Sequence, residues 1–299
     1  MKNKEEIFKF IPINIRKRVE SFFNEDQIYE MRIRTERPII LEAESKNYVI
    51  DYIVSKNEIE EIFEKICENS VYTYKNEICE GFLTVKGGHR IGITGNCVVE
   101  NGKIINIKDV SSLNIRIAQE KIGCGNFILK YILDYKENSI FNTLIASPPG
   151  CGKTTILRDT IRQLSNGIPE INFHGLTVGV VDERNEISAM NKGIPQNDIG
   201  IRTDVIENSC KAKGMKILIR SMAPKIIACD EIGSKEDSEA IEYAICSGIK
   251  GIFTAHGDSL EMLKQNNEIN EIIKKNIIQR IIFLDNKKIG NIREVINIS

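Results

Sequence analysis

The sequence predicts an α/β chain of two domains, in which a parallel sheet covered by helices follows a smaller α+β region. Residues 1–125 alternate short apolar strands with turns, whereas from residue 126 onward apolar strands alternate with helices. At about 150 residues per domain, the 299 residues suffice for two hydrophobic cores. We therefore expect an α+β domain over 1–125 and an α/β domain over 126–299.

Hairpin signals separate the strands predicted in the first domain. Short apolar strands are indicated in 38–50 and 80–107, and turn-forming pairs interrupt the second range at Gly87–Gly88 and Asn101–Gly102. A helix is predicted over 57–70, because apolar residues recur there at helical spacing. These elements indicate a small α+β domain.

The second domain reads as strands that alternate with helices. The predicted strands are 142–147, 176–182, 225–230, 251–256, 280–285 and 293–298. The predicted helices begin at Lys153, span 209–222 and about 235–247, and begin again near 258. This alternation is typical of a parallel sheet with helices on both faces.

Composition restricts the function. Lys and Arg (41) nearly balance Asp and Glu (42), and no stretch is strongly basic, so nucleic acid is not expected as a partner. The start of the chain is charged, and no 18-residue apolar run occurs, so we expect a cytoplasmic protein with at most peripheral membrane contact. The eight cysteines and three histidines are scattered, which indicates free thiols and no zinc site.

The first chemical motif is a phosphate-binding loop between a predicted strand and a predicted helix. Its residues are Ser147, Pro148, Pro149, Gly150, Cys151, Gly152, Lys153, Thr154 and Thr155. Gly150 and Gly152 allow the backbone N–H groups to approach phosphate, Lys153 supplies charge to the β and γ oxygens, and Thr154 supplies a magnesium ligand. ATP and Mg²⁺ are therefore the expected ligands.

Two positions in this loop invite alternatives. Ser147 stands where the usual pattern has glycine; serine is small and Pro148 stiffens the following path, so we expect the substitution to be tolerated. Cys151 is interpreted as a side chain that faces away from the phosphates. The alternative is a thiol activated by the helix N-terminus, whose oxidation would block nucleotide binding.

Two predicted strands end in Asp-Glu pairs, Asp182–Glu183 and Asp230–Glu231. Because strand carboxyl ends line the ligand crevice of a parallel sheet, both pairs can face the phosphates. Asp230 is predicted to hold magnesium through water, and Glu231 to polarise the attacking water. Helix capping is the competing interpretation for either glutamate. Asp followed directly by Glu, with a strand inserted between this motif and the phosphate loop, favours an ATPase of the additional-strand type.

The next predicted strand ends at Thr254 and His256. This position suits a polar sensor of the γ-phosphate or of the magnesium state. A histidine in a strand-end turn is the alternative.

Taken together, the segments SPPGCGKTT, VVDERNEI, GMKILIRSMAPKIIACDEIG and GIFTAHG resemble the phosphate loop, aspartate box, Walker B motif and histidine box of the type II/IV secretion ATPase superfamily. With TVKGGHRIGITG and SSLNIRIA in the N-terminal half, the chain resembles more narrowly the stage III sporulation AA family of endospore-forming Firmicutes. The resemblance implies a P-loop NTPase fold, RecA-like and of the additional-strand type, in the second domain.

The resemblance also implies a biological setting. The family implies a mother-cell cytoplasmic ATPase, docked peripherally at the membrane that faces the forespore, on the channel between the two cells. Similarity to secretion ATPases implies a ring, expected as a homo-hexamer. The implied partners are the membrane-anchored stage III sporulation protein AB and the other channel components.

Phosphoryl transfer also calls for a cation on the γ-phosphate, and four arginines are candidates. They are Arg90, Arg116, Arg202 and Arg220. Arg116 is the first choice, because it resembles the secretion-ATPase arginine that reaches from the N-terminal domain, and Arg220 is the second. The same resemblance leaves the water-activating role open between Glu231 and Glu183.

Three hypotheses follow. The first is a ring-forming ATPase that energises the sporulation channel. The second is an ATPase stimulated by nucleic acid. The third is an assembly hub in which ATP only drives oligomerisation.

Overall fold

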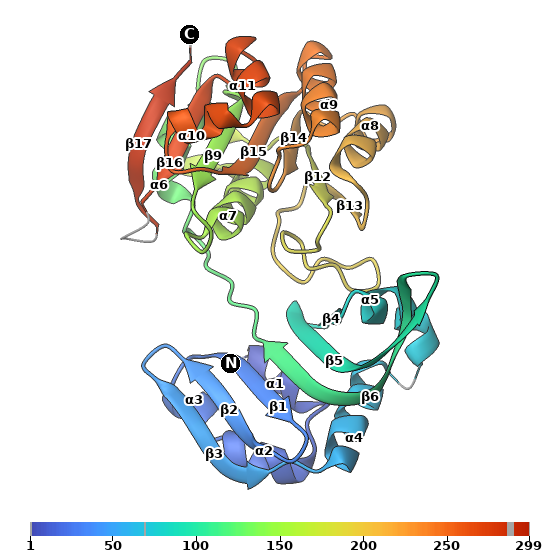
Figure 1. Ribbon diagram of the computed structural model, residues 1–299. Coiled ribbons are helices and arrows are strands. Elements are labelled where there is room, and N and C mark those ends of the chain that lie inside the picture. Colours follow the sequence, from blue (N-terminus) through green and yellow to red (C-terminus); the bar gives the residue numbers. More distant parts are fainter. Residues whose placement is uncertain (1, 69, 286–289, 299) are drawn as a thin grey trace. The chain divides into compact units, whose positions relative to one another are not determined.

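The computed structural model describes residues 2–68, 70–285 and 290–298. It forms two compact units (Figure 1). The N-terminal unit comprises Met1–Gln119 and Ala189–Gln196, and the C-terminal unit comprises Glu120–Ser188 and Asn197–Ser299. Within the described ranges, no helix has both the length and the apolar composition needed to cross a bilayer.

The N-terminal unit is built on a six-stranded antiparallel sheet in the order β3-β2-β1-β6-β5-β4. The strands are β1 (Ile28–Arg34), β2 (Pro38–Ala43), β3 (Asn47–Ile53), β4 (Phe82–Val85), β5 (His89–Glu100) and β6 (Lys103–Arg116). The helices are α1 (Lys2–Phe8), α2 (Ile13–Val19), α3 (Phe22–Glu25), α4 (Lys56–Ile66) and α5 (Lys75–Cys79), with a 3₁₀ turn at Val71–Tyr74. Alternate strand residues such as Met31 and Ile33 are buried with the helices in one core, whereas Arg32 and Arg34 beside them are only half-buried.

Local signals explain these elements. The β4–β5 hairpin turns at Gly87–Gly88 and the β5–β6 hairpin at Asn101–Gly102, and all four residues have positive φ (88°, 76°, 49° and 75°). Both predicted hairpins are confirmed. Helix α4 begins at a capping box, in which the Ser55 hydroxyl accepts from the Glu58 N–H and the Glu58 carboxylate accepts from the Ser55 N–H.

The C-terminal unit is built on a seven-stranded sheet in the order β13-β12-β14-β15-β9-β16-β17, parallel except for the last pair. Its strands are β9 (Thr143–Ser147), β12 (Val178–Asp182), β13 (Thr203–Glu207), β14 (Ile226–Cys229), β15 (Lys250–His256), β16 (Arg280–Leu284) and β17 (Ile292–Asn297). Its helices are α6 (Asn126–Ile132), α7 (Lys153–Asn166), α8 (Lys211–Ser221), α9 (Lys235–Cys246), α10 (Leu260–Gln265) and α11 (Asn267–Lys274). Two short hairpins, β7 (Leu133–Asp134) with β8 (Ser139–Ile140) and β10 (Gly167–Ile168) with β11 (Phe173–His174), and a 3₁₀ turn at Pro169–Ile171 complete the unit.

Helices cover both faces of this sheet (Figure 1). One core contains residues of α6 and α7, and the other contains residues of α8, α9 and α11. Since β9 and β12 contribute to both cores, every residue of these two strands is buried. Strand β15 lies between β9 and β14, which confirms the additional-strand arrangement.

Helix α6 and the two short hairpins were not predicted, and two further elements of this unit differ from the expectation. The helix predicted from residue 258 is divided into α10 and α11, because the Asn266 side chain accepts from the N–H groups of Glu268 and Ile269 and so caps a new helix. Strand β13 was not predicted. Its residues are all half-buried, so it lacks the alternation that marks a strand in sequence.

The segment 189–196 packs with the N-terminal unit, although its neighbours in sequence belong to the C-terminal unit. The Asn191 side-chain amide donates to the Thr84 carbonyl (3.1 Å), and the Gly87 N–H donates to the Gln196 side chain (2.8 Å). The chain therefore passes between the units at three places, after residues 119, 188 and 196.

Asp159 on α7 ties the start of the C-terminal unit to this helix. Its carboxylate is 4% exposed and accepts from the N–H groups of Gly123 (3.0 Å) and Gly125 (2.7 Å) and from Arg162 (2.8 Å). Burial alone would raise the pKa of Asp159, but these hydrogen bonds and the Arg162 charge outweigh it and hold the pKa below its ordinary value.

We expect Asp159→Ala to lower the free energy of unfolding by about 2–4 kcal/mol, because buried N–H donors and a guanidinium lose their acceptor. Since the folded-state pKa is depressed, the stabilisation is present above the ordinary pKa of an aspartate and is lost as pH falls through the folded value. Urea denaturation at neutral and acidic pH measures both effects. Asp51→Ala, at an exposed carboxylate, is the control, and an equal loss in both variants would contradict the assignment.

Candidate active site

The phosphate loop joins β9 to α7 as the sequence predicts. Gly150 and Gly152 have φ values of 79° and 82°, a region that other residues enter only with strain. Gly152 is the residue before α7, so the unpaired N–H groups of the first turn of this helix face the loop. These N–H groups and the helix dipole make the loop a suitable anion site.

Ser147 ends β9 in extended backbone, which any residue adopts. It is fully buried, and its hydroxyl donates to the Pro148 carbonyl (3.0 Å). Nothing in the backbone at this position demands glycine. Cys151 is also buried, with its sulfur 3.8 Å from the Pro149 carbonyl oxygen.

Lys153 is folded back onto its own loop. Its ammonium group donates to the carbonyls of Ser147 (2.9 Å) and Pro148 (3.1 Å) and lies 3.3 Å from Nδ1 of His256. Burial lowers the pKa of Lys153, and the charges of Asp230 and Glu231 oppose this shift. These carbonyl oxygens thus accept the hydrogen bonds of the buried ammonium group that the oxygens of a bound phosphate would accept instead.

Thr154 contacts the acidic end of β14. Its hydroxyl donates to one oxygen of Asp230, and the hydroxyl of Thr254 donates to the other. A hydroxyl beside a carboxylate offers hard oxygen ligands, which fits magnesium held by one or two protein oxygens and completed by phosphates and water. Among the described residues there is no cluster of three or more His, Cys, Asp or Glu that could hold a metal without such help.

Glu231 lies between the phosphate loop and the aspartate box. Its backbone is left-handed (φ 51°), and its N–H donates to the Thr254 hydroxyl (2.8 Å). One carboxylate oxygen lies 2.9 Å from Nε2 of His256, and the other accepts from Arg184 (2.8 Å). A left-handed glutamate costs on the order of 1 kcal/mol and is typical of functional sites, where surrounding contacts maintain it.

His256 connects Glu231 to Lys153. Since an ammonium group can only donate, Nδ1 of His256 is the acceptor from Lys153, and the neutral ring carries its proton on Nε2, which donates to Glu231. The chain of contacts from Lys153 through His256 to Glu231 places the predicted sensor residue next to the predicted base.

The aspartate box has a different arrangement. Asp182 is 2% exposed, and its carboxylate accepts from the N–H groups of Glu186, Ile187 and Ser188 and from the Ser188 hydroxyl. These bonds fold residues 183–188 into a tight loop.

Glu183 is paired with Lys211 of α8 at 2.5 Å. Burial opposes protonation of Lys211, but the hydrogen bond and charge of Glu183 outweigh it, so the pKa of Lys211 is raised.

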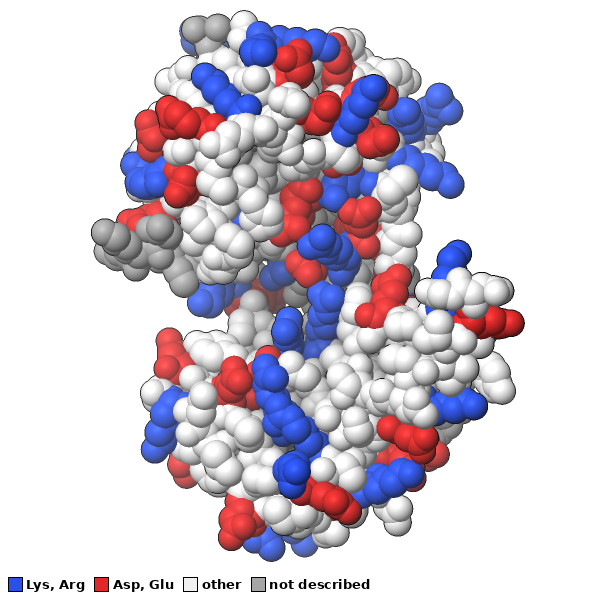
Figure 2. Space-filling view, in the orientation of Figure 1, with Lys and Arg blue, Asp and Glu red and all other residues white. Residues whose placement is uncertain are grey.

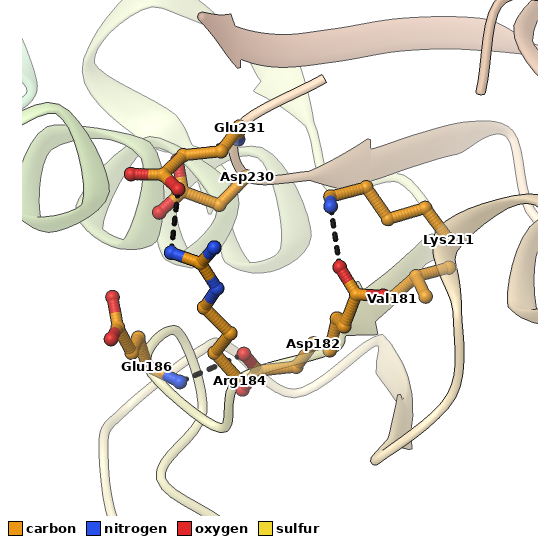
Figure 3. A pocket seen from close by; sticks show the side chains of 8 residues that line it. Val181, Asp182, Arg184, Glu186, Lys211, Asp230 and Glu231 are labelled. Carbon is orange, nitrogen blue, oxygen red and sulfur yellow. Dashed lines mark hydrogen bonds and ion pairs between the residues drawn. The ribbon is translucent and has the colours of Figure 1, made fainter. Parts of the chain in front are cut away.

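Arg184 is a residue of the candidate site that the sequence reasoning missed. Figure 3 shows its guanidinium pointing toward Glu231. The small cavity around it is lined by Val181, Asp182, Glu183, Arg184, Glu186, Lys211, Asp230 and Glu231. Its position directly after an Asp-Glu pair at a strand end, beside the Walker B strand, was the available signal.

The predicted arginines lie in different places. Arg116 and Arg90 are direct partners across β6 and β5 of the N-terminal unit, so both side chains are on one sheet face. Arg116 is 64% exposed and 3.4 Å from Glu30, and Arg90 stacks on Phe82 (3.7 Å to the ring centre).

Arg202 and Arg220 lie away from the phosphate loop of their own chain. Arg202 donates to the Ser165 carbonyl (2.8 Å) at the end of α7. Arg220 is in the last turn of α8, which leads to the start of β14, whereas the loop lies at the carboxyl ends of the strands.

Charge is mixed over the surface. On the face drawn in Figure 2, acidic and basic side chains are interspersed on both units. This face has no broad basic area of the kind that nucleic-acid binding proteins present.

Comparison with known proteins agrees with this geometry. The chain is 37% identical to stage III sporulation protein AA of Bacillus subtilis over 262 residues, which cover 88% of this chain and 84% of the relative. Its fold is similar to that of the ATPase DotB of Yersinia pseudotuberculosis (TM-score 0.60, 15% identity, 95% and 79% of the two chains). It is similarly close to the pilus retraction motor PilT with bound ADP (TM-score 0.57, 12% identity, 89% and 76%). The fold is therefore the P-loop NTPase fold of secretion ATPases. Because the family model "Sporulation stage III, protein AA" matches residues 1–298, the chain belongs to that family.

Proposed function

We propose that this chain is an ATP-hydrolysing motor that energises the channel between mother cell and forespore. The observation that carries the proposal is the network at the carboxyl ends of β9, β14 and β15. There Lys153, His256 and Glu231 are connected in series, and Thr154 contacts Asp230. In a phosphate-binding fold, this network supports the proposal of a cation, a magnesium site, a base and a sensor around one position.

Each residue has a distinct role in this proposal. The loop 147–155 and Lys153 bind the phosphates, and Thr154 and Asp230 would hold Mg²⁺, which neutralises charge on the β and γ oxygens. Glu231 orients the attacking water and accepts its proton. His256 contacts both Lys153 and Glu231, so it transmits to Glu231 whether Lys153 has bound phosphate. Glu183 is the alternative base. We rank it after Glu231 because it is paired with Lys211.

The arginine of the transition state comes from the N-terminal unit in this proposal. The exposed guanidinium of Arg116 can contact a nucleotide, whereas that of Arg90, beside it on the same face, stacks on Phe82. Arg220 reaches a nucleotide only on a neighbouring subunit, because it lies at the opposite end of its own sheet.

We place the motor in the mother-cell cytoplasm, as a homo-hexamer docked peripherally on the membrane-anchored protein AB and the other channel components. Membership of the sporulation family and the fold shared with secretion ATPases support this placement.

The test measures phosphate release from ATP with and without the soluble part of protein AB. Light scattering measures the mass of the chain with and without ATP and with and without the same partner. We expect hydrolysis that rises with the partner and a mass that rises toward six copies with ATP. Absence of hydrolysis under all these conditions would refute the motor. Stimulation by DNA or RNA instead of protein AB would favour an ATPase that acts on nucleic acid.

A further inference from the structure

We propose that Arg184 binds the γ-phosphate of the ATP held by its own chain and, in doing so, releases Glu231 to activate water. This inference rests on the proposed ATPase function and adds a residue and a switching step to it. In the structure Arg184 holds Glu231 instead.

The first step of the argument concerns the two carboxylate oxygens of Glu231. His256 occupies one at 2.9 Å and Arg184 the other at 2.8 Å. A carboxylate that accepts a proton from water needs one of these oxygens. Each oxygen keeps a second acceptor site, but a cation bonded to a carboxylate stabilises its ionised form. Withdrawal of Arg184 would therefore favour proton transfer from water to Glu231.

Arg184 is the partner that can leave at lower cost. Its side chain is 64% exposed, and an exposed ion pair contributes only about 0–1 kcal/mol. His256 is also engaged by buried Lys153 through Nδ1, so moving it would disturb the phosphate loop.

The charges around Arg184 indicate where it goes. The cavity has five acidic lining residues and two basic ones, Arg184 and Lys211, and Lys211 is bonded to Glu183 at 2.5 Å. A γ-phosphate near Glu231 would place two anions side by side. Transfer of Arg184 from Glu231 to the γ-phosphate would place its charge on the stronger anion, whose oxygens match the fork of guanidinium donors.

The backbone that carries Arg184 is attached to the phosphate-loop helix. Asp182 accepts three N–H groups of the loop, and Arg158 of α7 donates to the carbonyls of Ile187 (2.7 Å) and Glu186 (2.6 Å). Only the Arg184 side chain has to move. A cation carried on a fixed backbone can reach developing charge without reorganisation of the main chain.

The test compares the affinities of Arg184→Ala for ADP and for a non-hydrolysable ATP analogue. We expect analogue affinity to fall by roughly 10-fold and ADP affinity by less than about two-fold, with turnover reduced by roughly 100-fold or more. Arg184→Lys should recover analogue affinity better than turnover, because lysine keeps the charge but not the fork. Arg293→Ala, at an exposed arginine of the edge strand β17, is the matched control.

Equal losses for ADP and the analogue, or no loss, would overturn the inference while leaving the motor intact. A wild-type chain that binds no ATP would instead overturn the proposed function. Mixing Arg184→Ala with Lys153→Ala subunits tests action within one chain. No recovery of hydrolysis supports it, whereas recovery would show that Arg184 serves a neighbouring subunit.

Discussion

Glu231→Gln is expected to reduce ATP turnover by roughly 10³-fold while ATP affinity stays within about three-fold of wild type, because a general base contributes about 10²–10⁴ to rate. Glutamine keeps an oxygen that can accept from His256, but it cannot take a proton from water. The NH₂ group of glutamine replaces the other carboxylate oxygen and cannot accept a hydrogen bond from Arg184. The ion pair between Arg184 and residue 231 is therefore lost. Fluorescent-nucleotide binding and phosphate release separate the two effects.

Glu183→Gln is the reciprocal variant for this experiment. Glu183 is paired with Lys211, so we expect its removal to change turnover far less than that of Glu231. Normal turnover in Glu231→Gln together with a large loss in Glu183→Gln would transfer the role of base to Glu183. Full sporulation supported by a hydrolysis-deficient Glu231→Gln chain would favour the assembly hub.

Lys153→Ala is expected to weaken ATP binding by roughly 10²–10³-fold, which corresponds to about 3–4 kcal/mol of lost charge-assisted hydrogen bonds to phosphate. The fold should persist, since within the described part of the chain Lys153 bonds to its own loop and to His256, and burial of its charge carries a desolvation cost. Isothermal titration with ATP and a thermal melt measure binding and folding separately.

Lys274→Ala, at an exposed lysine on α11, is the control for this variant. ATP affinity unchanged in Lys153→Ala would refute the assignment of the phosphate loop. A collapse of the melting temperature would show instead that the lysine supports the fold.

The sequence predicted the fold class from local patterns. The alternation of strands and helices after residue 126 predicted the parallel sheet. The position of β15 between β9 and β14 confirmed that the sheet is of the additional-strand type. The hairpins at Gly87–Gly88 and Asn101–Gly102 were predictable because positive φ favours particular residues. Strand β13 was not predictable, because its half-buried residues lack a period.

The candidate site was visible in part. The loop 147–155, the Asp230–Glu231 pair and His256 are marked by residue types at strand ends, and the sheet brings these strand ends together. The structure adds to each its partners, such as Thr254 with Asp230. The packing of 189–196 with the N-terminal unit has no periodic signal and follows from contacts such as Asn191 with Thr84.

The sequence by itself determined that a phosphate-loop motif and two acidic strand ends belong to one parallel sheet, since these depend on neighbouring residues and on strand direction. Only the tertiary structure decided which partner each acidic residue binds. Asp182 is bound by its own loop, Glu183 by Lys211, and Glu231 by His256 and Arg184. The physical reason is that most of these partners lie 25 to 47 positions apart along the chain and meet only when the strand ends converge.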